Sequence, residues 1–390
     1  VTVYEANNYV GGHTNTIDVE TSEGHLAVDT GFIVFNDRTY PNFLRILDEL
    51  GVAHQTTSMS FSVRDDRTGL EYNGTSLNRL FAQRSNLISP SFFRMLTDII
   101  RFNKRARTLL YQPDNTITLG DYLAEEGFSD ELREGYLVPM GAALWSADPE
   151  KMADFPARYF VQFFHNHGLL GFGNRPDWFV IKGGSREYVK AMTASFANRI
   201  RMRTPVRSVR RHENGVDVCT DSAEPERFDQ IVLACHSDQA LAMLADPSDD
   251  ERRVLGAIPY QPNTAVLHTD SSVLPRRIRA WGAWNYLVPR SKQDRVAVTY
   301  DMNILQSLRT EHEYCVTLNY TDHINPDTII AEIEYHHPVY TVEGISAQQR
   351  RDAICGHRRT YFAGAYWGFG FHEDGVKSAL HACAKLGVSL

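Results

Sequence analysis

The segments VTVYEA (residues 1–6) and TYFAGAYWGFGFHEDG (residues 360–375) decide the fold of this chain. The first is rich in β-forming residues and ends in a carboxylate, so it predicts a strand over 1–5 closed by Glu5. The second predicts an apolar strand over 360–364 and a helix over 374–386. A dinucleotide site needs an acid for the ribose hydroxyls and a helix N-terminus near the pyrophosphate. We therefore expect one nucleotide site that joins the two ends of the chain.

The residues between these two segments alternate strand and helix patterns. Asn42–Leu50 predicts a helix closed by Gly51, and Asn214-Gly215 predicts a tight hairpin turn. Further strands are expected at 14–20, 25–35, 58–63, 70–72, 206–212, 216–220, 228–235, 265–268, 284–288, 296–300 and 315–319. Further helices are expected at 91–110, 119–126, 129–136 and 157–166, and one opens at 182–185 and runs through 196.

Composition excludes several classes of protein. The chain has 390 residues and a net charge of −8, which leaves no basic excess for nucleic-acid binding. Five cysteines without a CxxC pair predict neither a zinc site nor a disulfide framework, and no histidine pair has metal-ligand spacing, so no metal is expected. A reducing cytoplasm fits this cysteine usage. No apolar run approaches 18 residues, so no membrane-spanning helix is expected.

Three motifs resemble one family of flavoproteins. GGHTNT (11–16), DTGFIVFN (29–36) and YFAGAYWGFGFHEDG (361–375) are similar to the amine oxidase, phytoene desaturase and protoporphyrinogen oxidase superfamily. Within it they resemble the predicted NAD/FAD-binding oxidoreductases encoded beside cyclopropane-fatty-acid-synthase-like genes. The resemblance covers nearly the whole chain and implies FAD as the cofactor. The Gly-rich fingerprint belongs roughly 20 residues before the ribose acid, so we expect it ahead of Val1, outside this sequence.

The resemblance implies an α/β fold with two interleaved parts. A Rossmann-like FAD-binding domain is expected at 1–74, 180–245 and 345–390. An α+β substrate domain is expected at 75–179 and 246–344. No cysteine lies in 361–375, so FAD is expected to be held non-covalently.

The N-terminal motif supplies several candidate cofactor contacts. Glu5 would accept hydrogen bonds from the ribose, and Gly11-Gly12 would let the backbone approach the cofactor, although an ordinary turn is the alternative. His13 and Thr14 follow at the place where the family often has an arginine. A neutral histidine is a weaker phosphate partner than a permanent cation.

Other candidate cofactor residues come mainly from the resemblance. Thr30 and Gly31 would pass beside the flavin ring, with a β-bulge as the alternative. Val206 would offer backbone groups to the adenine, with a buried strand valine as the alternative. At the C-terminal motif, Gly364 and Ala365 would approach the cofactor, and the helix N-terminus at Glu373, Asp374 and Gly375 would hold an anion or the ribityl chain. A plain N-cap explains Asp374 alone.

Tyr366 and Trp367 are the candidate catalytic residues. In the resembled family, aromatic side chains near this position form the substrate side of the flavin pocket. Core packing is the alternative for both rings. No confident counterpart exists of the family lysine near flavin N5, since only Arg277 and Arg279 lie nearby in sequence order, so amine oxidation is disfavoured.

The predicted function is FAD-dependent oxidation or desaturation of an organic substrate, a lipid acyl chain if the gene association holds. The alternatives are an amine oxidase, a redox-neutral flavoprotein such as an isomerase, and a non-catalytic FAD-bound partner of a lipid methyltransferase. The basic amphipathic segment 91–110 could lie on an anionic membrane, which would make the protein peripheral, or could cover the substrate cavity. The second interpretation is favoured.

Overall fold

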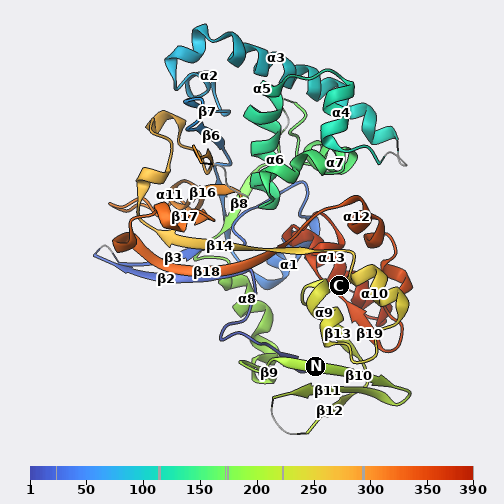
Figure 1. The fold of residues 1–390 in the computed structure, drawn as a ribbon. Coiled ribbons are helices and arrows are strands. Elements are labelled where there is room, and N and C mark those ends of the chain that lie inside the picture. The colour runs from blue at the N-terminus through green and yellow to red at the C-terminus, as the bar shows by residue number, and fades with distance from the viewer. Residues whose placement is uncertain are drawn as a thin grey trace.

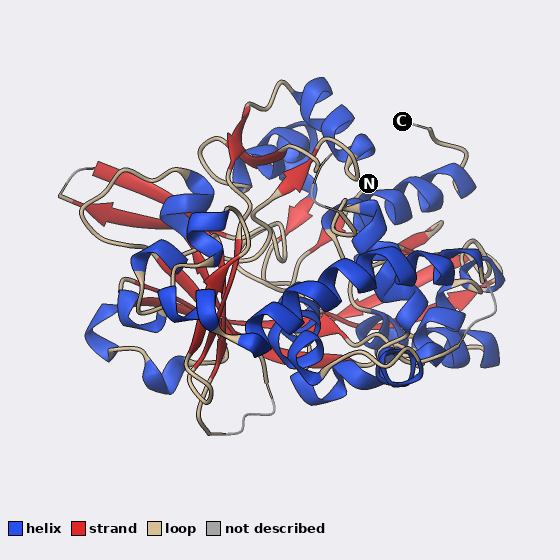
Figure 2. Ribbon diagram, turned by 90° about the horizontal axis from the view of Figure 1, so that it is seen from above, coloured by secondary structure: helices blue, strands red, loops and turns tan. Residues whose placement is uncertain are grey.

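The computed structural model describes residues 1–22, 24–112, 116–171, 173, 175–221, 224–291 and 295–389. A helical layer lies at one end of the molecule, a long curved sheet crosses the middle, and a small three-stranded sheet lies at the other end (Figure 1). Seen from above, the helices crowd around the strands of the central sheet (Figure 2). Among the described residues, none of the helices combines the length and apolar character needed to cross a bilayer.

Strands from both ends of the chain form parallel pairs, as expected for a nucleotide-binding part. β1 (Val3–Tyr4) pairs with β9 (Ile200–Arg201), and β13 (Ile231–Leu233) pairs with β19 (Thr360–Phe362). The expected strand 228–235 is shorter because the chain changes sheets within it: β12 (Glu226–Phe228) ends one sheet before β13 begins the next. The predicted hairpin is confirmed as β10 (Val206–His212) and β11 (Gly215–Thr220), with β12 beside it.

Helices cover these strands and complete the nucleotide-binding part. They are α1 (Pro41–Leu50), α8 (Arg186–Thr193), α9 (Ser237–Met243), α10 (Asp249–Leu255), α12 (Val342–Gln348) and α13 (His372–Lys385). One apolar core joins β10, β11, β13 and β19 to α9, α10, α12 and α13. A second core joins α1 and α8 to the small sheet of β4 (Phe35–Asn36), β8 (Trp178–Ile181) and β5 (His54–Thr57).

The central sheet has seven strands and forms the base of the second part. Its order is β18 (Ile329–Pro338), β14 (Tyr260–His268), β17 (Cys315–Leu318), β16 (Ala297–Asp301), β15 (Trp284–Val288), β6 (Phe61–Asp65) and β7 (Leu70–Asn73). The predicted boundary at residue 74 is therefore misplaced. β6 pairs in parallel with β15, so residues 61–73 belong to the sheet of the second part.

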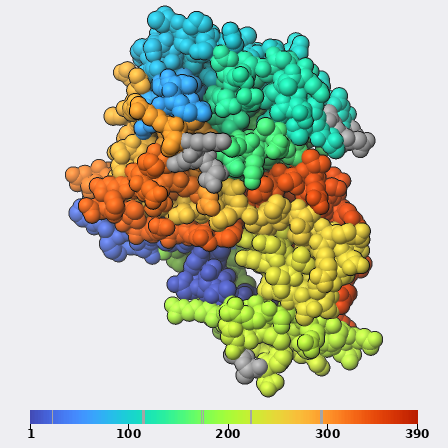
Figure 3. Space-filling model, viewed as in Figure 1, coloured from blue at the N-terminus to red at the C-terminus, as the bar shows by residue number. Residues whose placement is uncertain are grey.

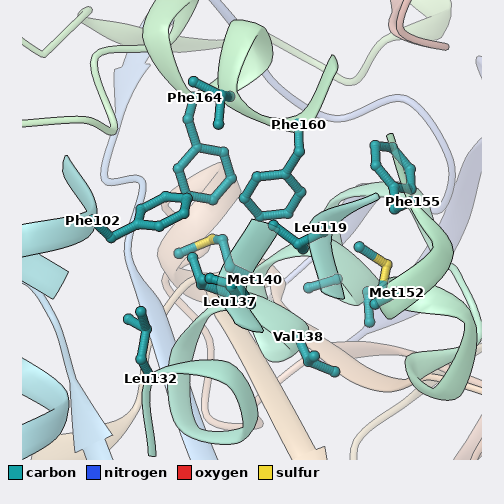
Figure 4. Packing of buried hydrophobic residues seen from close by; sticks show 14 of the residues in the cluster. Phe102, Leu119, Leu132, Leu137, Val138, Met140, Met152, Phe155, Phe160 and Phe164 are labelled. Carbon is teal, nitrogen blue, oxygen red and sulfur yellow. The ribbon is translucent and has the colours of Figure 1, made fainter. Parts of the chain in front are cut away.

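The helical layer packs on one face of this sheet and contains the largest apolar core (Figure 4). Its elements are α2 (Leu77–Leu80), η1 (Arg84–Ile88), α3 (Pro90–Arg105), η2 (Ala106–Tyr111), α4 (Leu119–Glu125), α5 (Asp130–Leu132), η3 (Arg133–Leu137), α6 (Val138–Trp145), η4 (Pro149–Asp154) and α7 (Ala157–Asn166). The helix expected at 129–136 is present, and it continues without a break from α5 through the π-helical segment η3 into α6. Pro139 has no N–H to donate, and the carbonyl of Gly135 accepts a hydrogen bond from the Tyr72 hydroxyl at 2.7 Å.

The hairpin of β2 (Thr16–Thr21) and β3 (Gly24–Asp29) packs against the sheet through Val19 and Val28. The expected strand 25–35 stops at Asp29 for a structural reason. The Asp29 carboxylate accepts hydrogen bonds from the backbone N–H and hydroxyl of Ser185, both at 2.8 Å. This fixes the hairpin to the start of α8, and the chain then turns at Thr30–Gly31.

Candidate functional site

A cavity of about 1160 Å³ runs between the two parts of the molecule. Its walls include Glu5 and Gly364, which follow β1 and β19, and also Ile99 of α3. Because both terminal motifs and the helical layer contribute, the cavity joins the predicted nucleotide site to the predicted substrate part. The predicted residues Glu5, Gly11, Gly12, His13, Thr30, Gly31, Gly364, Ala365 and Tyr366 line it, whereas Thr14, Val206, Trp367, Glu373, Asp374 and Gly375 do not.

Glu5 stands where the sequence placed it, directly after β1. Its backbone N–H donates to the Arg201 carbonyl at 2.9 Å, which holds the strand end in place. Its carboxylate accepts the N–H of Asn7 at 2.8 Å and faces the cavity. A carboxylate fixed at a strand end has acceptor capacity left for a ribose hydroxyl.

The double glycine bends the chain along the cavity wall. Gly11 has φ +130°, and a Cβ there would lie 2.5 Å from the carbonyl oxygen of Thr14. A Cβ on Gly12 would meet no atom within 4 Å, so its surface is open. The glycines therefore shape the turn and also leave backbone free for a bound molecule.

His13 lies within a cluster of rings on the same wall. Its ring stacks on Tyr335 at 4.8 Å and lies 5.3 Å from His337 and 6.0 Å from His236. Burial lowers the pKa of His13 to about 4, so the ring is neutral near pH 7. Its Nε2 has no hydrogen-bond partner among the described residues. This nitrogen is buried with its hydrogen-bonding capacity unused, and the ring around it is neutral and not a cation.

The requirement for glycine at position 31 is explained by a contact within the protein. A Cβ there would lie 2.2 Å from the carbonyl oxygen of His13, which also accepts the N–H of Phe32 at 2.7 Å. Thr30 is bound to Tyr335 through their hydroxyls at 2.9 Å. Close approach of the two chain segments is enough to require glycine at 31, and contact with the flavin stays a prediction.

The C-terminal motif bends sharply at the cavity. A Cβ on Gly364 would lie 2.3 Å from the ring of Tyr366, so only glycine lets that ring fold back over the strand end. The N–H of Gly364 donates to the Ser378 hydroxyl at 2.8 Å, which ties it to α13. Gly375 lies behind Ala365, since a Cβ there would come 3.9 Å from the Ala365 nitrogen.

Glu373 and Asp374 have structural partners. Glu373 is 2% exposed, and its carboxylate accepts the backbone N–H groups of Asn42 and Phe43 at 3.2 and 2.9 Å. It therefore caps α1 and fastens that helix to α13. Asp374 accepts the N–H of Phe371 at 3.1 Å and caps its own helix, and burial raises its pKa to about 6. The alternative of a plain N-cap explains Asp374.

The two candidate catalytic residues, Tyr366 and Trp367, lie in different environments. Tyr366 lines the cavity, is 3% exposed, and has a hydroxyl with no partner among the described residues. Trp367 instead packs on the core of β10, β11, β13 and β19, with the Arg351 guanidinium 5.9 Å from its ring. The structure thus places Trp367 outside the cavity, against the prediction that it forms the substrate wall.

Sequence reasoning missed several residues of the site. His372 lines the cavity, stacks on Phe32 at 3.8 Å and shares a hydrogen bond with the Tyr188 hydroxyl at 3.0 Å. Burial lowers its pKa to about 3. His372 stood inside a quoted motif, so it could have been found. Tyr335 and His337 come from β18, whose placement beside the N-terminal motif no local pattern reveals.

The far end of the cavity is an apolar arm. We define it by Leu80 of α2, Leu96, Ile99 and Ile100 of α3, and Met140 and Leu144 of α6. Six further aromatic rings line the cavity: Trp145, Phe163, Tyr260, Trp284, Tyr340 and Phe369. Among the described lining residues the carboxylates are Glu5, Asp177 and Glu334, and none belongs to the arm.

A cavity shared by a nucleotide-binding part and a second, helix-covered part is typical of an enzyme that binds a dinucleotide cofactor and an organic substrate side by side. Residues 1–321 match the model of the flavin-containing amine oxidoreductase family. The chain belongs to that family, and it is an FAD-dependent oxidoreductase. The α/β fold with a Rossmann-like FAD-binding part is thereby confirmed.

Solved structures share this fold at low sequence identity. The CLA-producing fatty acid isomerase from P. acnes is 15% identical with a TM-score of 0.70, over 99% of this chain and 92% of the other. Cyclohexylamine oxidase from Brevibacterium oxydans IH-35A is 15% identical with a TM-score of 0.68, over 99% and 94%. Putrescine oxidase bound to putrescine is 15% identical with a TM-score of 0.67, over 99% and 93%.

The residues at the nucleotide end fit FAD. The Glu5 carboxylate, the open backbone at Gly12, the unpartnered Nε2 of His13 and the backbone at Gly364–Ala365 offer both acceptors and donors along one wall. Two expected outcomes test how this wall holds the cofactor.

We expect acid precipitation of the FAD-loaded protein to release all of its flavin into the supernatant. Cys235 is a cysteine that lines the cavity, and burial raises its pKa to about 12, so it stays a thiol with little nucleophilic character. Absorbance of the supernatant and of the washed pellet measures the partition. Flavin retained in the pellet would contradict non-covalent binding.

Glu5→Gln and Glu373→Gln are expected to act on different properties. Glu5→Gln removes a charged acceptor from the ribose, so the Kd for FAD is expected to rise about tenfold with an unchanged Tm of the flavin-free protein. Glu373→Gln removes the buried cap of α1 and is expected to lower the free energy of unfolding by about 1.5–3 kcal/mol. Fluorescence titration and thermal melts of both variants check this. An unchanged Kd in Glu5→Gln removes Glu5 from the cofactor site.

Proposed function

We propose that this protein oxidises or desaturates a lipid acyl chain. The observation that carries the proposal is the apolar arm, whose six defining side chains are uncharged and apolar, although Asn103, Tyr136 and Arg175 line the same cavity. Burying a methylene contributes about 0.8 kcal/mol, so such an arm selects a long hydrocarbon chain. An ammonium group would find no carboxylate there.

The chain's own residues would position the reacting carbon and keep water away from it. The rings of Trp145, Tyr340 and Trp284 line the cavity and would shield the acyl chain from water. When bound, FAD supplies a two-electron acceptor for a hydride from the acyl chain. Tyr366 lies on the same wall as Gly364, so its ring would limit how the acyl chain approaches the cofactor.

Anaerobic reduction of the enzyme tests the proposal. Purified FAD-loaded protein is mixed with phospholipids and free fatty acids, some with methyl or cyclopropane branches, and with putrescine and cyclohexylamine. We expect an acyl compound to bleach the flavin absorbance and to be recovered with two hydrogens fewer, as an added double bond. Bleaching by amines alone would overturn the lipid assignment and support amine oxidation.

A redox-neutral reaction is the second candidate. The fold similarity to a fatty acid isomerase motivates it. Turnover by an isomerase leaves the flavin oxidised and gives a product of unchanged mass. Mass spectrometry of the recovered lipid therefore separates desaturation, which loses two hydrogens, from isomerisation.

A further inference from the structure

The end of the molecule formed by α2, η1 and α3 exposes apolar side chains. In η1 Ile88 is 85% exposed, and in α3 Phe93 is 46% and Ile100 58% exposed. Phe93, Thr97, Ile100 and Lys104 follow one another at helical spacing, so they form one outward stripe along α3. Soluble surfaces rarely gather large exposed side chains in this way unless something covers them.

The same end carries positive charge in an otherwise acidic protein. Residues 75–112 hold seven Arg or Lys residues and a single acid, Asp98, while the whole chain has a net charge of −8. Arg94, Arg101 and Arg105 are paired with Glu131, Asp98 and Glu126 on the side of α3 that faces α4 and α5. Within the described part of the chain, Arg79, Arg84 and Lys104 have no ion-pair partner, so their charge is directed to solvent.

A neighbouring loop extends this surface. Arg79 donates to the Trp281 carbonyl at 3.2 Å, which places α2 beside η7 (Ile278–Ala280). Ile278 is exposed, and Arg279 next to it is exposed as well. We call the whole area the α2–α3 face, made of Arg79, Arg84, Ile88, Phe93, Ile100, Lys104, Ile278 and Arg279. It lies at the end of the molecule opposite the three-stranded sheet (Figure 3).

The α2–α3 face also borders the apolar arm. Leu96 and Ile99 line the cavity from the inner side of α3, and Ile100 both lines the cavity and is more than half exposed. Ile100 therefore belongs both to the cavity wall and to the outward stripe of α3. A chain that enters beside Ile100 would meet Leu96 and Ile99 of the arm.

We propose that the α2–α3 face docks on an anionic lipid bilayer and opens the arm toward it. Exposed Ile88, Phe93 and Ile278 would enter the boundary between headgroups and acyl chains, while Arg79, Arg84 and Lys104 would contact lipid phosphates. Charge complementarity favours a membrane because the basic side chains surround the apolar ones. The docking itself does not depend on turnover; only the delivery of an acyl chain through the arm rests on the proposed function.

Vesicle co-sedimentation tests the docking. The protein is mixed with phosphatidylcholine vesicles, with or without about one third phosphatidylglycerol. We expect binding to the anionic vesicles that weakens as salt is raised. The triple variant Arg79→Gln, Arg84→Gln, Lys104→Gln is expected to bind about a hundredfold more weakly, at about fivefold per charge. Ile88→Ser with Phe93→Ser is expected to weaken binding to anionic vesicles even at low salt.

Matched controls keep this result interpretable. Arg199→Gln, Arg210→Gln and Arg309→Gln remove three exposed cations elsewhere, and Met192→Ser with Ile330→Ser removes exposed apolar groups elsewhere. All variants are compared at equal folded fraction. Wild type that stays in the supernatant, or controls that lose binding as much as the face variants do, would overturn the docking. In that case a protein partner, such as a lipid methyltransferase, would be the better candidate for binding to the α2–α3 face.

A second readout separates docking from catalysis. The charge variant is expected to reduce its flavin at the wild-type rate with acyl substrate dissolved in detergent, and more slowly with substrate in anionic vesicles. Equal rates in vesicles for the charge variant and wild type would overturn delivery through this face. Absence of reduction in detergent for wild type as well contradicts the proposed function and leaves the sedimentation result standing.

Discussion

Trp367→Ala is expected to destabilise the protein without slowing the reaction, whereas Tyr366→Ala is expected to slow it about a hundredfold. Trp367 packs on the core of β13 and β19, so its loss is expected to lower the free energy of unfolding by about 3 kcal/mol, the low end for a large aromatic because the ring is half-buried. Tyr366 lines the cavity beside Gly364. Removing its ring leaves room for the substrate to shift, and a displacement of about 1 Å can cost about a hundredfold in hydride transfer.

Both variants are measured by melting temperature and by anaerobic flavin reduction per folded, FAD-loaded molecule. Tyr366→Phe serves as the conservative control. It removes only a buried hydroxyl without a described partner, so its stability is expected to stay near or above that of wild type. If Tyr366→Ala loses only stability and keeps its reduction rate, Tyr366 is a core residue and the substrate-wall assignment is wrong for both aromatics.

Much of the nucleotide-binding part was accessible from the sequence because its signals are local. A strand that ends in Glu5, a double glycine and the Gly364 turn each follow from residue types within a few positions, and the structure brings all of them to one cavity. Glu373 was misplaced for the opposite reason. Its partners Asn42 and Phe43 lie more than 300 residues away in sequence, and no local pattern indicates that α1 begins against α13.

The predicted boundary between the two parts, at residue 74, was wrong for a related reason. The sequence of β6 and β7 predicts a hairpin that could belong to the N-terminal part. The pairing of β6 with β15, which assigns this hairpin to the central sheet, joins residues more than 200 positions apart. The ring cluster around His13 could not be predicted for the same reason, since His236 and His337 are more than 200 residues away in sequence and meet His13 only in the folded chain. Long-range strand pairing is decided by the packing of whole sheets, which a single sequence pattern does not encode.

Leu96→Trp is expected to lower kcat/KM for long acyl substrates about fifteenfold and to leave short ones nearly unaffected. Leu96 lines the arm from α3, so the larger indole would take space that the acyl chain needs. Excluding about two methylenes at about 0.8 kcal/mol each costs about 1.6 kcal/mol of binding, which appears as a change in kcat/KM that grows with chain length. The rate of flavin reduction at saturating short substrate should stay at the wild-type value, because the rings near the nucleotide end are untouched.

The matched control is Leu110→Trp, which makes the same change in η2 at a residue that packs on the helical core but does not line the cavity. It is expected to cost stability and to leave the dependence on chain length unchanged. Substrates of graded chain length, measured with both variants at equal FAD occupancy, give the slope of log(kcat/KM) against the number of carbons. A wild-type slope near zero, or the same slope in Leu96→Trp as in wild type, would show that the arm does not hold the acyl chain. The substrate would then occupy only the aromatic chamber around Trp145 and Tyr340, where a compact molecule such as a small amine fits better than a lipid.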